Sequence, residues 1–69
     1  SETARVAVVG NGMADLDLYV FDEDYELVVS DVAYDTDAYC EWVPQRGQIF
    51  HLVVVNAGPG SCDYCIMTN

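Results

Sequence analysis

Hydrophobic and polar residues alternate with a period of two along most of this chain. The clearest case is 16–21, where leucine and valine occupy every second position and aspartate and aromatic residues lie between them. A period of two predicts β-strands, because successive side chains of a strand face opposite sides of the sheet. No stretch has the spacing of an amphipathic helix. The pattern therefore predicts an all-β chain.

Six segments of this kind are separated by short stretches rich in glycine, proline and acidic residues. They are 5–9, 16–21, 26–30, 38–43, 49–56 and 64–68. Short strands at regular spacing, joined by turns, are typical of sandwiches and small barrels. We therefore expect one domain over 1–69, a small antiparallel β-sandwich of about six strands with a jelly-roll-like arrangement.

The same alternation predicts which side chains share the core face of each strand. The inward-facing set comprises Leu16, Leu18, Val20, Leu27, Val29, Tyr64 and Ile66. Three further sets share one face of their strand: Val6 with Val8, Cys40 with Trp42, and Phe50 with Leu52 and Val54. The strand that holds Trp42 should end at Pro44, since proline cannot donate a hydrogen bond to a sheet.

Some strands are apolar on their second face as well. A strand with two apolar faces is either central in its sheet or covered by something else, and six strands cannot easily cover both faces of one sheet. Apolar patches left on a surface commonly mark contacts with a partner. The alternative is scattered apolar surface residues, which are normal. The residues predicted for self-association are Tyr19, Phe21, Val53 and Val55.

Charge limits the partners that this chain could bind. Twelve acidic residues face two arginines, and the net charge is −10. Nucleic acids and anionic membrane surfaces both require a basic footprint, so neither is expected as a partner. Membrane insertion is not expected either, because no apolar run approaches the roughly 20 residues of a membrane span. The acidity fits either plain solubility or cation binding.

Ten of the twelve acidic residues lie between Asp15 and Glu41, in strands and turns that could converge at one end of a sandwich. Calcium takes about 6–8 oxygen ligands and suits clustered carboxylates. The candidate calcium ligands are Asp15 with Asp17, and Asp22 with Asp24. The alternative is a set of solvated loop acids without a metal.

Three cysteines, Cys40, Cys62 and Cys65, are many for so short a chain and indicate an oxidising compartment. A bridge between Cys62 and Cys65 would close a very short, strained loop. A bridge from Cys40 to one of the other two would stabilise more, and we expect that pairing without choosing between them. The remaining thiol would be free or bonded to another chain.

No arrangement of residues predicts catalysis. The spacing of Cys62 and Cys65 fits a redox motif, but no helix follows it as thioredoxin-like chemistry requires. The one histidine, His51, lies within a predicted strand and has no nucleophile motif near it. We therefore expect no enzyme activity and no cofactor other than calcium.

The run ADLDLYVFD at 14–22 is followed by LVVSD at 27–31. The first of these runs resembles the DLDLYVYD segment of bacterial pre-peptidase C-terminal domains, and the second resembles the strand and turn that follow it in that family. Trp42-Val43-Pro44, Gly47 and FHLVVVN at 50–56 resemble its W-x-P, glycine and Y-x-I-x-V-x-N run. The similarity continues through 64–69 and spans 4–69.

This resemblance implies a secreted bacterial β-sandwich without catalytic activity. Some members bind calcium, and some bind collagen or other insoluble substrates. Members usually begin with one more strand than this sequence shows. A sandwich short of a strand exposes an edge that can recruit another strand. We therefore expect an extracellular structural module that associates with copies of itself, as in a fibre. The alternative is an accessory domain of a secreted hydrolase that binds a protein or polysaccharide, with calcium.

Overall fold

The computed structural model describes residues 2–69, which form six β-strands in two sheets. The strands are β1 (Ala4–Gly10), β2 (Asp15–Phe21), β3 (Leu27–Asp31), β4 (Asp37–Trp42), β5 (His51–Gly58) and β6 (Tyr64–Thr68). Their bounds lie within two residues of the predicted ones, and the expected antiparallel sandwich of six strands is confirmed. Residues 2–69 contain no helix of the length and apolarity that crossing a membrane requires.

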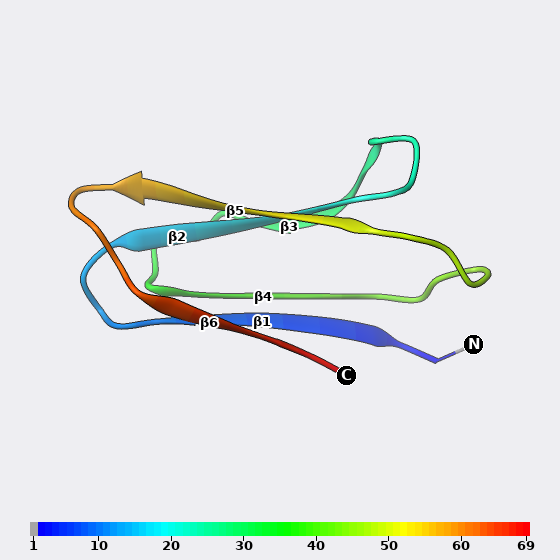
Figure 1. Ribbon diagram of the computed structural model, residues 1–69, viewed down its shortest axis with the longest axis horizontal. Coiled ribbons are helices and arrows are strands. Elements are labelled where there is room, and N and C mark those ends of the chain that lie inside the picture. The colour runs from blue at the N-terminus through cyan, green and yellow to red at the C-terminus, as the bar shows by residue number, and fades with distance from the viewer. Residues whose placement is uncertain (1) are drawn as a thin grey trace.

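The two sheets have three antiparallel strands each and lie one above the other (Figure 1). One has the order β4-β1-β6 and the other the order β3-β2-β5. Among the six strands of residues 2–69, only β2 and β3 form a hairpin, and each of the other connections passes from one sheet to the other. The strands β1 and β2 are therefore the middle strands, and they carry most of the core.

Within residues 2–69 the core consists of seven buried hydrophobic residues from β1, β2 and β4. They are Val6, Val8, Leu16, Leu18, Val20, Ala38 and Cys40. Trp42, Phe50, Leu52, Val54 and Val29 pack around them and are partly buried. The period of two therefore predicted the inward faces of β1, β2 and β4 correctly.

One side of the sandwich, between β3 and β4, is closed by a side chain. The carboxylate of Asp31, at the end of β3, accepts hydrogen bonds from the backbone N–H of Tyr39 (2.8 Å) and of Ala33 (3.1 Å). Asp31 thus occupies the outer edge of β4. Within the described chain, no strand pairs with this edge. The unpaired backbone groups of an edge strand can pair with another strand, and a side chain that binds these groups makes such pairing less favourable.

The acidic turn between β2 and β3 is built around Asp22. Its Oδ1 accepts hydrogen bonds from the backbone N–H of Asp24 and of Glu26, both at 2.9 Å. Tyr25 takes a positive φ of 62° within this turn, and its ring stacks on that of His51 at a centroid distance of 3.9 Å. The short acidic stretch between the predicted strands 16–21 and 26–30 therefore forms a turn.

The prediction that Leu27 faces inward is wrong. The register between β2 and β3 shifts between Val20 and Phe21, so Val20 lies opposite Val29 while Phe21 lies opposite Leu27. Paired residues of neighbouring strands point to the same side of the sheet, and Phe21 points away from the core. The bulge therefore turns Leu27 outward, where its side chain is 56% exposed.

The start of β1 and the end of the chain are joined by Asn69. Its Oδ1 accepts from the backbone N–H of Arg5 (2.9 Å), and its Nδ2 donates to the carbonyl of Thr3 (2.8 Å). These bonds add a side-chain clamp where the β6 ladder ends. In the described part of the chain β6 contacts β1 and no other strand, so the bonds of Asn69 help to hold β6 in place.

Candidate functional site

The side of the sandwich opposite Asp31 is open. There, β5 forms the edge of one sheet and β6 the edge of the other, and within residues 2–69 no strand pairs with the outer edge of either. We call this the open side and define it by the core-facing residues of the two strands, Leu52, Val54, Tyr64 and Ile66. Figure 1 shows β5 and β6 as the strands nearest the viewer.

Exposure of core-facing side chains distinguishes the open side from the rest of the sandwich. Ile66 lies directly opposite Val8 and therefore points to the same side of the sheet. Val8 is 0% exposed, whereas Ile66 is 46% exposed. Tyr64, predicted to face inward, is exposed to the same extent. The alternation placed these two side chains on the correct face, but nothing within the described chain covers them.

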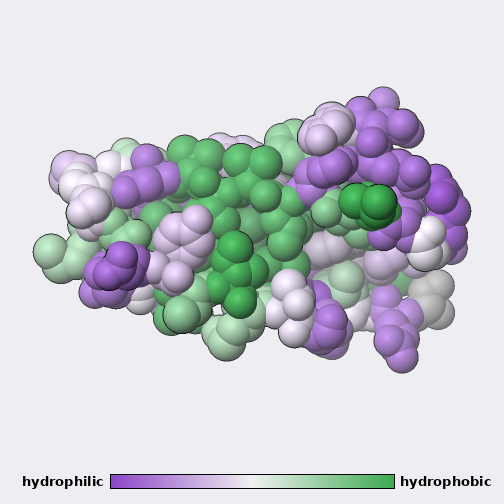
Figure 2. All heavy atoms as spheres, in the orientation of Figure 1, coloured by the Kyte–Doolittle hydropathy of each residue, from purple (hydrophilic) through white to green (hydrophobic). Residues whose placement is uncertain are grey.

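Hydrophobic residues gather on this side. Figure 2, which looks onto the open side, shows an apolar area in the middle of the molecule that spans both sheets, with hydrophilic residues towards the ends. A strand edge together with uncovered apolar side chains is the combination that recruits another chain.

The four residues predicted for self-association come together on a second surface, the outer face of the β3-β2-β5 sheet. Val53 lies directly opposite Tyr19, and Val55 lies opposite Asp17. The rings of Tyr19 and Phe21 stack with centroids 6.4 Å apart. We call Tyr19, Phe21, Val53 and Val55 the outer apolar face. It adjoins the open side, because β5 contributes to both.

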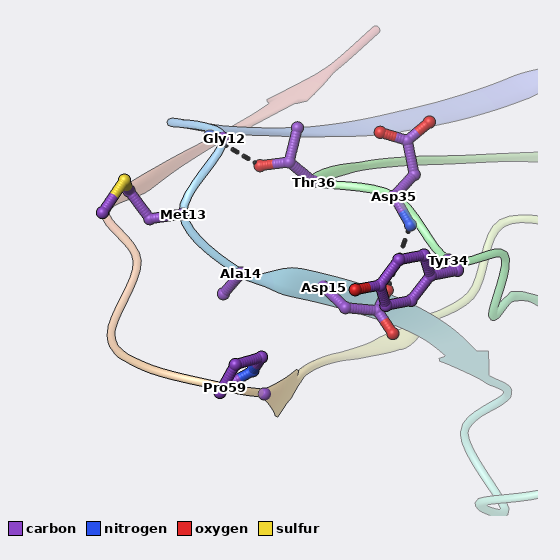
Figure 3. A pocket seen from close by; sticks show the side chains of 9 residues that line it. Gly12, Met13, Ala14, Asp15, Tyr34, Asp35, Thr36 and Pro59 are labelled. Atoms are coloured by element: carbon purple, nitrogen blue, oxygen red, sulfur yellow. Dashed lines mark hydrogen bonds between the residues drawn. The ribbon is translucent and has the colours of Figure 1, made fainter.

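A cavity of about 270 Å³ lies at one end of the sandwich, where three loops meet (Figure 3). It is lined by Gly12, Met13, Ala14, Asp15, Tyr34, Asp35, Thr36, Gly58 and Pro59. Two hydrogen bonds hold the loops together, from the backbone N–H of Gly12 to Thr36 Oγ1 (2.8 Å) and from that of Asp35 to Asp15 Oδ1 (3.2 Å). The side chain of Tyr34 is 88% exposed beside it. Sequence reasoning did not identify this cavity, because it depends on which loops the sandwich brings together.

The predicted calcium ligands do not converge. Asp15 and Asp17 lie at the start of β2, whereas Asp22 and Asp24 follow its end, roughly 20 Å away along an extended strand. Asp22 is already engaged with the backbone of its turn. Among residues 2–69, no three histidine, cysteine, aspartate or glutamate side chains lie close enough to hold one metal ion.

The expected bridge from Cys40 to Cys62 or Cys65 is not formed, and all three cysteines are free thiols. Cys40 lies in the core on β4, whereas Cys65 lies opposite Val9 on the outer face of β6. β1 separates these two strands, and Cys40 and Cys65 lie three residues apart along it, so their Cα atoms are roughly 14 Å apart, beyond the reach of a disulfide. The thiol of Cys62 instead donates to Asn11 Oδ1 at 3.0 Å.

Two groups, one in the core and one on the outer face of the β3-β2-β5 sheet, have shifted pKa values. Burial raises the pKa of the Cys40 thiol, and the negative charge of Asp31 raises it further. Burial also raises the pKa of Asp17 above its ordinary value of 3.8, with further contributions from the charges of Asp15 and then Asp31. Among residues 2–69, Asp17 Oδ1 has no hydrogen-bond partner. Asp17 adjoins the outer apolar face, so this face carries a carboxyl group whose pKa is raised.

Asp17 should therefore lower the stability of the fold as pH rises. The folded chain holds the Asp17 proton more tightly than the unfolded chain. The resulting contribution to the free energy of unfolding is fully present below pH 3.8, and it is lost as pH rises through the raised pKa of Asp17 in the folded chain. In the Asp17→Asn variant, stability relative to the unaltered chain should increase between about pH 4 and about pH 7.

Urea unfolding at both pH values measures this difference. Asp63→Asn, which removes the same charge from the β5–β6 loop, is the matched control. An equal increase in the two variants would show that net charge, and not the position of Asp17, is responsible.

Comparison with known protein families, curated proteins and solved structures gives no match to this chain.

Proposed function

We propose that this chain is a non-catalytic structural module of the extracellular space that associates with other copies of itself, as the subunit of a fibre. The observation that carries the proposal is the contrast between Val8 and Ile66, which share one face of a sheet but differ by 46 percentage points in exposure. An incomplete sandwich gains free energy when a neighbour covers this surface.

The outer apolar face supports the proposal. A fibre needs at least two contact surfaces on each subunit, because a single self-complementary surface closes into a dimer. The open side and the outer apolar face are two such surfaces, and they adjoin along β5. The extracellular location rests on the resemblance of 14–22 and 42–56 to a secreted bacterial family.

Sizing of the purified chain over a hundredfold range of concentration, with electron microscopy of the concentrated sample, tests the proposal. We expect species that grow with concentration and filaments at the high end. Val53→Lys should abolish the filaments, because it places a charge in the outer apolar face. Val43→Lys, an exposed valine beyond the end of β4, is the matched control and should not. A chain that stays monomeric throughout would overturn the proposal.

The end cavity favours a second candidate function, an accessory module that binds a protein or polysaccharide. Exposed aromatic side chains beside a hollow are typical of ligand sites, and Tyr34 has this position. A binding module has no need to assemble, so a monomer at every concentration would favour this candidate.

A further inference from the structure

We propose that the open side is covered by the open side of a second copy, related by a two-fold axis perpendicular to the sheets. In this arrangement β5 pairs with β5 of the second copy and β6 with β6 of the second copy, both antiparallel. Two six-stranded sheets then run through the dimer, and the half-exposed core residues of both copies become its centre. This inference rests on the proposed function and specifies the partner and geometry of its first contact.

The distribution of charge allows this contact despite a net charge of −10. Neither β5 (HLVVVNAG) nor β6 (YCIMT) contains an acidic or basic residue other than His51. The acidic residues lie on β2, on β4, at the end of β3 and in the loops. The two copies therefore approach through the least charged surface of the molecule, where repulsion between them is weakest.

The dimensions of the open side match those of a stable interface. The molecule measures 38 by 21 by 16 Å, and the open side is the 38 by 21 Å face. Its projected area is roughly 800 Å², which is about the area that each partner buries in a specific protein complex. An additional strand alone would cover one edge only, whereas a second copy covers both.

Strand lengths favour the pairing of β5 with β5 and of β6 with β6 of the second copy. β5 has eight residues and β6 has five, so pairing each with its own copy leaves no overhang. Pairing β5 with β6 of the second copy would leave three residues of each β5 unpaired. Figure 1 shows the two strands at the same level along the long axis, so one two-fold axis can pass through both.

A charge on the core side of β6 tests the contact. Ile66→Lys places an ammonium group in the centre of the dimer, and we expect it to raise the dimer Kd at least about tenfold. Met67→Lys is the matched control, because Met67 is the next residue, 53% exposed, and faces outward. Analytical ultracentrifugation of both variants measures the effect, and equal dissociation constants would overturn the proposal.

The position of Cys65 distinguishes the two pairings without altering the open side. In the Cys62→Ser variant, Cys65 is the exposed thiol and Cys40 is buried, so a spin label attaches at Cys65. Serine retains the donor that Cys62 offers to Asn11. If β6 pairs with β6 of the second copy so that the two Ile66 residues lie opposite each other, the two labelled Cα atoms are about 8 Å apart on the same outer face. Pairing of β5 with β6 places the labels on opposite outer faces, more than about 15 Å apart.

We expect strong dipolar broadening of the frozen-solution spectrum in the dimer. An unbroadened spectrum from a sample that sediments as a dimer would overturn the geometry but leave the proposed self-association intact. A labelled chain that sediments as a monomer at all concentrations would overturn both. The label also keeps the inference testable if Ile66→Lys fails to fold.

Discussion

Replacing Leu18 with alanine is expected to destabilise the monomer by about 2–5 kcal/mol. Leu18 is 0% exposed and lies at the middle of the central strand β2, opposite Asp31 on one side and Val54 on the other. A leucine-to-alanine change in a packed core loses the burial of the side chain and leaves a cavity. A chain of 69 residues has a total stability of roughly 3–10 kcal/mol, so the variant should be largely or partly unfolded at room temperature.

Thermal unfolding, monitored by circular dichroism at low protein concentration, measures the loss without a contribution from association. We expect the melting temperature to fall by at least about 10 °C. Leu27→Ala is the matched control, since Leu27 is turned outward by the bulge and should change stability by less than about 0.5 kcal/mol. A similar loss in the two variants would contradict the position of the core.

Replacing Gly10 with alanine is expected to cost about 1–3 kcal/mol, although it adds only one methyl group. A Cβ atom at Gly10 would lie 2.5 Å from both the carbonyl oxygen and the Oγ1 of Thr36, and 3.0 Å from Leu16 Cδ1. The carbonyl belongs to the loop between β3 and β4, so the loop must move as a unit. That movement would also strain the bond from the Gly10 N–H to Asp37 Oδ1 (3.1 Å).

Gly47→Ala provides the control for the change from glycine to alanine itself. A Cβ atom at Gly47 would meet nothing within 4 Å, so alanine there should be neutral or slightly stabilising. Urea unfolding of both variants separates the steric effect at Gly10 from the general effect on the unfolded chain. Equal stabilities would show that the loop of Thr36 yields without cost.

The alternation of the sequence was sufficient to predict the strands and most of the core. It succeeded for β2 because three aliphatic residues occupy every second position and face one side. It failed at Leu27 because a bulge shifts the register by one residue, and the sequence near 26–29 carries no signal for it. One such shift moves a side chain to the other face of the sheet.

The candidate site was predicted only in part. The apolar second faces of β2 and β5 were sufficient to predict the outer apolar face, which consists of Tyr19, Phe21, Val53 and Val55. These two strands are neighbours in one sheet, so their outward side chains form a single surface. The open side could not be located from the pattern, since the exposure of Ile66 depends on β6 being an edge strand that, within residues 2–69, contacts no strand of the other sheet. Likewise, the separation of Cys40 from Cys65 follows from the order of strands in one sheet.

The rate at which the thiol of Cys40 is chemically modified also measures how often the sandwich opens. Its thiol is 2% exposed in the core, and burial keeps it in the unreactive protonated form. An alkylating reagent therefore modifies Cys40 only while the sandwich is transiently open, whereas Cys65 reacts at once. The ratio of the two modification rates gives the fraction of time that the core is accessible. Any neighbour that covers the open side should slow the reaction at Cys40 about tenfold for each ~1.4 kcal/mol of stability that it adds.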